Sequence, residues 1–153
     1  MWRYAILVLL LAALPARADF GEGLAAYDAG DYAAARTAWL PLAEQGDSAA
    51  QTALAGLYAQ GAGVPRDYAA AARWFRRAAD QGDMVGQLNL GDYYASGLGV
   101  PRDLETAWLW LSLAARQDSV WATNRRDAVA REMSAAAIAA ATRRLERWRP
   151  KKP

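Results

Sequence analysis

The chain contains no cysteine and no histidine, and its only lysines are Lys151 and Lys152. The most common general base, the most common transition-metal ligands and any disulfide are therefore excluded. None of the serines is followed three residues later by lysine, so the acylating Ser-x-x-Lys motif of penicillin-binding proteins and β-lactamases is also missing. We expect a protein without catalytic residues, a metal site or a cofactor.

The chain does contain a repeat of 36 residues. Residues 47–82 and 83–118 align without a gap and are identical at sixteen of the thirty-six positions. The segment YAQGAGVPRDYAAAARWFRRAADQ returns in the second copy as YASGLGVPRDLETAWLWLSLAARQ. Repetition at this length is typical of supersecondary units that stack on one another.

Each copy begins with a pattern that predicts an α-helix, which we call helix A. Its apolar positions fall at i, i+4, i+7 and i+8 on one helical face. In the first copy these positions are Ala50, Leu54, Leu57 and Tyr58. The following Gly61, Gly63 and Pro65 predict a turn, because glycine accepts positive φ and proline has no amide hydrogen.

A second helix, helix B, is predicted after each turn. Asp67 and its counterpart Asp103 are good N-caps, since a carboxylate accepts hydrogen bonds from the free amides of the first turn. Two apolar stripes at helical spacing follow the caps, namely Ala71, Trp74, Phe75 and Ala78, and then Ala107, Trp110, Leu111 and Ala114.

One helical hairpin cannot cover its own apolar stripe, so we predict an all-α fold in which antiparallel helix pairs stack as an α-solenoid. Residues 19–46 form an atypical first hairpin that lacks the glycine-rich insertion, and residues 47–82 and 83–118 are full repeats. Residues 119–149 are expected to form capping helices with a polar outer face, and residues 150–153 a disordered tail.

The repeated pattern A-Q-x-x-L-x-x-x-Y-x-x-G-x-G-V-P-x-D-x-x-x-A-x-x-W-x-x-x-A-A resembles the Sel-one-like repeat family, which is related to the tetratricopeptide repeat. The resemblance covers residues 47–117 directly, and residues 31–46 resemble helix B of a preceding unit. It implies an adaptor that scaffolds other proteins, and some bacterial members of the family are associated with cell-wall ligands.

Residues 1–18 predict a secretory signal peptide. They combine a basic Arg3, an apolar run over residues 5–14 and the small-residue site Ala16-Arg17-Ala18. The run is too short for a membrane anchor, which needs about 20 apolar residues. We expect cleavage after Ala18 and a periplasmic protein that keeps no transmembrane segment.

Charge is divided along the mature sequence. Residues 19–118 hold 13 acidic and 7 basic side chains, and residues 119–153 hold 3 acidic and 9 basic ones. The basic residues include Arg143, Arg144 and Arg147 on one face of the last predicted helix. This basic cap is interpreted as a solvated face or as a contact for acidic proteins or the anionic envelope, because an exported protein meets little nucleic acid.

A flank of helix A is the predicted binding groove. Gln60 in the first copy, and Asn89, Asp92 and Ser96 in the second, lie beside the apolar stripe and would line up from repeat to repeat. A solvated helix face is the alternative interpretation. Most tryptophans fall at core positions, and Trp108 is the one expected to be partly exposed.

The sequence thus predicts an exported, non-enzymatic repeat protein that binds a protein or peptide partner in the cell envelope. One alternative is a binder of peptidoglycan fragments, or a protein with weak activity on β-lactams. A second alternative is an accessory subunit of an envelope or export complex. The partner and the oligomeric state stay open.

Overall fold

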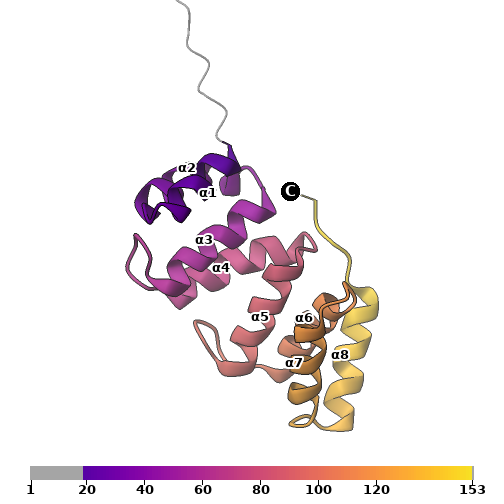
Figure 1. The fold of residues 1–153 in the computed structure, drawn as a ribbon. Coiled ribbons are helices and arrows are strands. Elements are labelled where there is room, and N and C mark those ends of the chain that lie inside the picture. Colours follow the sequence, from indigo (N-terminus) through magenta and orange to yellow (C-terminus); the bar gives the residue numbers. More distant parts are fainter. Residues whose placement is uncertain (1–18, 153) are drawn as a thin grey trace, which may run out of the picture.

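The computed structural model describes residues 19–152, and all the regular structure in this range is helical. The helices are α1 (Phe20–Asp28), α2 (Tyr32–Glu44), α3 (Ser48–Gln60), α4 (Tyr68–Asp80), α5 (Met84–Ser96), α6 (Leu104–Ala115), α7 (Val120–Ala130) and α8 (Ala135–Arg147). Each helix from α1 to α6 packs against the next along the chain. Figure 1 shows the resulting stack of helix pairs, which descends from α1 and α2 to α7 and α8. The predicted all-α solenoid is confirmed.

Every helix of the described range begins at a side chain that caps it. Each capping oxygen accepts a hydrogen bond from a backbone amide of the first turn. The caps are Asp19, Asp31, Asp47, Asp67, Asp83, Asp103, Ser119 and Ser134. The expected caps Asp67 and Asp103 are among them. Asp47 and Asp83, which cap the A helices, are 36 residues apart, and the same spacing leads to Ser119 at the start of α7.

The glycine-rich turn brings each repeat against the helix B that precedes it. Gly99 has φ +68°, and a Cβ at this position would overlap with the carbonyl oxygen of Tyr68, at the start of α4. Gly63 has φ +67° and approaches the backbone of Tyr32 at the start of α2 in the same way. The second glycine of the motif therefore serves two purposes, a left-handed turn and close backbone packing between repeats.

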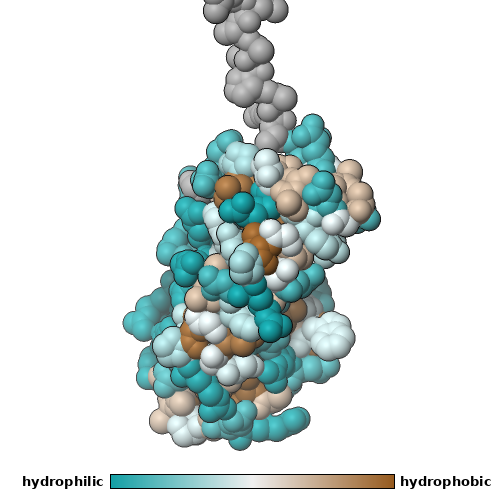
Figure 2. Space-filling view, turned by 90° about the vertical axis from the view of Figure 1, so that its left-hand side faces the viewer, coloured by the Kyte–Doolittle hydropathy of each residue, from teal (hydrophilic) through white to brown (hydrophobic). Residues whose placement is uncertain are grey.

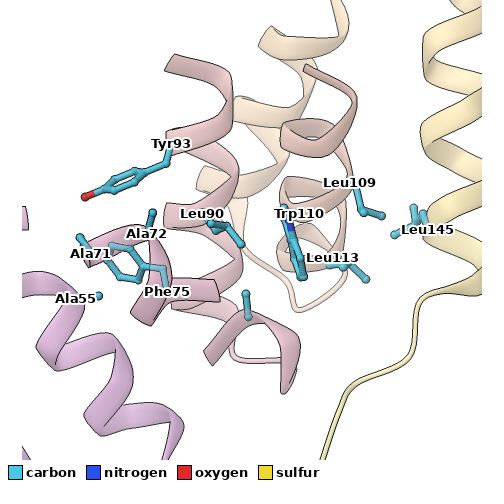
Figure 3. Close-up of a cluster of buried hydrophobic side chains, with 11 residues drawn as sticks. Ala55, Ala71, Ala72, Phe75, Leu90, Tyr93, Leu109, Trp110, Leu113 and Leu145 are labelled. Carbon is cyan, nitrogen blue, oxygen red and sulfur yellow. The ribbon is translucent and has the colours of Figure 1, made fainter. Parts of the chain in front are cut away.

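The buried side chains form a core that runs through the stack. Trp110 is 3% exposed, and Phe75 and Leu90 lie with it in the cluster drawn in Figure 3. Trp74, which was expected to fill the same position as Trp110, is only partly buried. In the repeat of residues 47–82 the buried aromatic side chain is instead that of Phe75, which is 4% exposed.

The C-terminal helices do not form another hairpin of the same kind. Both α7 and α8 pack against α6. Figure 3 shows Leu145 of α8 directed towards Leu109 and Leu113 of α6. The side of α7 that faces away from α6 is consequently left without a helix packed along it.

The segment after α8 returns across the end of α4. The backbone amide of Lys151 donates to the carbonyl of Asp80 at 2.7 Å, and its Nζ lies 2.8 Å from the Asp80 carboxylate. Trp148 packs edge-to-face on Trp110, with the ring centroids 6.3 Å apart. Residues 150–152 thus differ from the expected disordered tail, because a charge pair and a backbone hydrogen bond fix Lys151.

No helix within residues 19–152 has both the length and the apolar character needed to cross a bilayer. Figure 2 shows one side of the molecule, where most of the surface is hydrophilic and apolar residues form small patches between polar ones.

Candidate functional site: the face formed by the A helices

The predicted groove residues occupy equivalent positions on successive A helices. Ala53, Gly56 and Gln60 lie on α3, and the 36-residue shift places Asn89, Asp92 and Ser96 on α5. We call these six residues the A-helix face. All six are partly or fully exposed, so none is part of the buried core.

The α3 part of this face borders an open hollow. The hollow has a volume of about 220 Å³ and lies between α1 and α3. We call it the α1–α3 hollow. Its lining residues are Phe20, Leu24, Tyr27, Trp39, Thr52, Ala53, Gly56 and Gln60.

Aromatic side chains fix the floor of the hollow. The ring of Phe20 stacks on Trp39 with a centroid distance of 5.5 Å, and Trp39 Nε1 donates to the Phe20 carbonyl at 3.1 Å. Gly23 allows this arrangement, because a Cβ there would overlap with the indole ring of Trp39. The hydroxyl of Tyr27 donates to Gln60 Oε1 at 3.4 Å, which places one polar contact at the rim.

Two of the lining residues, Leu24 and Gly56, leave room for a ligand in the hollow. Leu24 is 46% exposed, so part of its side chain is available for contact with another molecule. Gly56 contributes no side chain, and a Cβ there would meet only Gln60 Nε2, at 3.8 Å. The absence of a side chain at residue 56 therefore creates space for another group.

The α5 part of the face is more occupied. The Asp92 carboxylate forms an ion pair with Arg125 of α7, and Asn89 Nδ2 donates to Val85 O at 2.9 Å within its own helix. Ser96 is exposed. Because both side chains of the ion pair are about 40% exposed, the pair contributes only ~0–1 kcal/mol. Asp92 thus links α5 to α7 rather than pointing freely into a groove.

The three predicted cap arginines differ in their surroundings. Arg144 donates from Nη1 and Nη2 to Thr106 Oγ1, each at 3.2 Å, and so ties α8 to α6. Arg143 and Arg147 are exposed. These two side chains remain candidates for contact with an acidic partner, while Arg144 has a role in holding α8.

Thr106 joins Arg144 to a carboxylate. Its hydroxyl accepts from Arg144 and donates to Asp103 Oδ2. Burial raises the pKa of Asp103, but the hydrogen bonds from Thr106 and the charge of Arg144 outweigh it and hold that pKa below its usual range. The first turn of α6 is thereby connected to α8.

The most exposed tryptophan in the described range is Trp121, at 81%, and its neighbour Val120 is 70% exposed. Trp108 is partly buried, as expected. The apolar spacing of the sequence places most tryptophans at core positions and does not predict the exposure of Trp121. Extending the 36-residue register into α7 would have revealed it, since residue 121 then corresponds to Ala49 and Val85, which are both exposed.

Within residues 19–152 no three acidic side chains come together in a way that could hold a metal ion. The α1–α3 hollow is instead an apolar surface with a polar margin. Such a surface recognises another molecule by shape and burial.

Residues 48–83 and 85–119 match the family model of the Sel1 repeat. Among solved structures, the chain is similar to c5321, described as a protective antigen present in uropathogenic Escherichia coli strains and displaying an SLR fold. That match has a TM-score of 0.80 and 30% identity, and it covers 84% of this chain and 28% of the other.

A second similar structure is a Sel1 repeat protein from Oxalobacter formigenes, with a TM-score of 0.67 and 31% identity. That match covers 71% of this chain and 44% of the other, so this chain spans less than half the length of either structure. No curated protein matches the chain.

Proposed function

Since the chain carries two tandem Sel1 repeats, a kind of unit that generally mediates contacts between proteins, we propose that it is a non-enzymatic interaction protein of the cell envelope. Its partner binds on the A-helix face. An apolar side chain of the partner enters the α1–α3 hollow, and polar groups of the partner meet the exposed amides and hydroxyls beside it.

The α1–α3 hollow is the observation that carries this proposal. Its aromatic floor is held by the Trp39 hydrogen bond, so the site exists before the partner arrives. Burial of one large apolar side chain contributes about 1.5–3 kcal/mol, and such anchors dominate binding energy at protein interfaces. Leu24 adds to this apolar contribution to the binding free energy, because a partner would cover the exposed part of its side chain.

The polar margin supplies orientation. Gln60 is exposed at the end of α3, and Ser96 occupies the equivalent position on α5. Groups at equivalent positions of successive repeats are spaced regularly along a solenoid and can contact an extended or helical segment. We assign to these residues a role in specificity, because a hydrogen-bonding group left unpaired on binding costs affinity.

We propose further that the protein works outside the cytoplasm. The signal-like features of residues 1–18 support this location, and α1 begins at Phe20, directly after the Asp19 cap. Cleavage after Ala18 would leave the cap and the helix whole. A basic segment at residues 119–152 is also suited to anionic components of the envelope.

The experiment compares two substitutions at one position. Gly56→Leu fills the hollow with a side chain, whereas Gly56→Ala adds only the Cβ that the structure accommodates. Both should keep or raise the melting temperature, because glycine is the poorer residue inside a helix. In affinity purification from envelope extracts, wild type and Gly56→Ala should capture the same partner, and Gly56→Leu should lose it.

A second comparison tests whether the partner binds the basic cap instead of the hollow. If the Gly56→Leu variant retains the partner while reversal of Arg143 and Arg147 to glutamate removes it, binding uses the basic cap, and the hollow has no role. Arg144 is left unchanged in this variant because its contact with Thr106 holds α8 in place.

A further inference from the structure

Apolar side chains are exposed at both ends of the stack. At one end Leu24 lines the α1–α3 hollow and is 46% exposed. At the other end Val120 and Trp121, the first residues of α7, are 70% and 81% exposed. The tryptophan and the valine beside it present apolar surface that a contact with another molecule would bury.

The position of Trp121 in the repeat explains why it is uncovered. Residue 121 corresponds to Ala49 of α3 and Val85 of α5, which are also exposed although those helices are packed on two sides. In addition, α8 turns back onto α6 and does not cover α7. The two similar solved structures are longer chains, of which this one spans 28% and 44%.

The two ends carry opposite charge. Residues 19–46 contain five acidic side chains and one basic side chain, a net charge of −4. Residues 119–149 contain seven basic and three acidic side chains, a net charge of +4, whereas Lys151 and Lys152 lie away from this end, beside Glu44 and Asp80. One end of a molecule should therefore attract the other end of a second molecule and repel the same end.

We propose that the α1–α3 hollow of one molecule binds Trp121 of a second copy of the chain, so that molecules associate head to tail. This inference rests on the proposed function of the hollow and names its occupant. The volume of about 220 Å³ is sufficient for an aromatic ring, since an apolar cavity of ~150 Å³ takes up benzene. Phe20, Tyr27 and Trp39 offer the indole aromatic partners at the floor.

The contact joins two different surfaces, so it leaves one free hollow and one free Trp121 in every open assembly. Such a heterologous contact produces rings or open chains rather than a closed symmetric dimer. Head-to-tail association would continue the stack of helices by contact between copies.

The first experiment measures mass in solution by light scattering and sedimentation velocity, using protein produced from the full-length sequence. The average mass should rise with protein concentration and fall with added salt, because the ends carry opposite charges. Trp121→Ala and Gly56→Leu should each weaken association more than about tenfold, as loss of an anchor does. Gly56→Ala, the matched control, should associate like wild type.

The second experiment mixes the two defective variants. Trp121→Ala keeps an intact hollow, and Gly56→Leu keeps an intact Trp121. Each variant alone should be monomeric, and the mixture should form a dimer that cannot grow, because only one complete contact is available. This result would also show that both variants are folded, since each must provide its intact surface.

A wild-type protein that stays monomeric at every concentration overturns the proposal, and so does a mixture that stays monomeric. Neither result affects the proposed function if Gly56→Leu still loses a captured envelope partner that Gly56→Ala retains. Conversely, equal capture by both variants removes the hollow from the proposed function, whatever the state of association.

Discussion

Gln117 and Gln87 are joined side chain to side chain, with Nε2 of Gln117 donating to Oε1 of Gln87 at 2.9 Å. The same bond at the same length occurs one repeat earlier, between Gln81 and Gln51. Each of the inner glutamines also donates to a carbonyl at the end of the preceding helix B, Gln51 to Ala43 and Gln87 to Ala79. A pair of glutamines thus ties each full repeat to the one before it.

Gln87→Ala should destabilise the protein by about 1–3 kcal/mol, the cost of leaving buried polar groups unsatisfied. Gln87 is 1% exposed, so its removal leaves the buried Ala79 carbonyl without this donor, whereas the exposed Gln117 can bond to water instead. Urea unfolding measures the change. Gln60→Ala, at an exposed position of α3, serves as the control and should stay within ~0.5 kcal/mol of wild type. Equal effects of both substitutions would contradict a structural role for the glutamine pair.

Much of the fold could be predicted because apolar spacing and capping residues are local signals. Asp67 and Asp103 indicate the start of their helices by their position after the glycine-rich turn. The glutamine pair could not be recognised in this way. The spacing of apolar residues identifies the buried face of a helix, but it does not show which polar residues are also buried there. Gln51 lies directly beside the buried Ala50, and only the packing of the preceding helix supplies its partner.

The site was less predictable because it depends on contacts between repeats. The helical phase correctly placed Gln60 and Ser96 outside the core. It could not show that Asp92 pairs with Arg125, or that Gly56 leaves a hollow under α1, since both features require the angle between neighbouring helices. Trp121 occupies the register position of Ala49 and Val85, which are also exposed, so its exposure follows from its place in the repeat.

Trp110→Ala should cost about 3–5 kcal/mol, because it removes a large side chain from the centre of the core. Trp74→Ala should cost clearly less, since Trp74 is only partly buried and Phe75 provides the core contact of that repeat. Urea midpoints of the two variants give the comparison. Equal losses would mean that Trp74 is as central to the packing as Trp110.

Gly99→Ala should destabilise the protein by about 2–4 kcal/mol, because the new Cβ meets the Tyr68 carbonyl oxygen in addition to the strained positive φ. Gly30 provides a matched control. It has φ +79°, but a Cβ at this position would have no atom within 4 Å, so Gly30→Ala should cost only about 1 kcal/mol. Similar thermal unfolding curves for the two variants would show that the turn, and not the close packing, requires glycine at residue 99.

Export should yield a mature chain that begins at Asp19. Intact mass measurement of protein recovered from the periplasm should show the loss of residues 1–18. Replacement of the small residue at the expected cleavage site, as in Ala18→Phe, should give a longer product that stays with the membrane. Recovery of unprocessed wild-type protein from the cytoplasm would exclude the export proposal.

Asp103→Asn should destabilise the protein at neutral pH, and this difference from wild type should shrink in acid. The folded state lowers the pKa of Asp103, so the carboxylate stabilises the fold above its unfolded value of about 3.9. That contribution is lost as the pH falls through the lower folded value, because the protonated side chain no longer carries the charge that Thr106 and Arg144 stabilise.

Urea midpoints of wild type and Asp103→Asn, measured from neutral pH to about pH 2, isolate this contribution because all other carboxylates are shared by both proteins. Thr106→Val removes the hydroxyl that donates to Asp103 and accepts from Arg144, while it preserves the carboxylate. It should reduce the same pH-dependent difference, since the hydroxyl is a main cause of the lowered pKa. A difference between wild type and Asp103→Asn that stays constant over the whole range would show that Asp103 acts only as a neutral cap of α6.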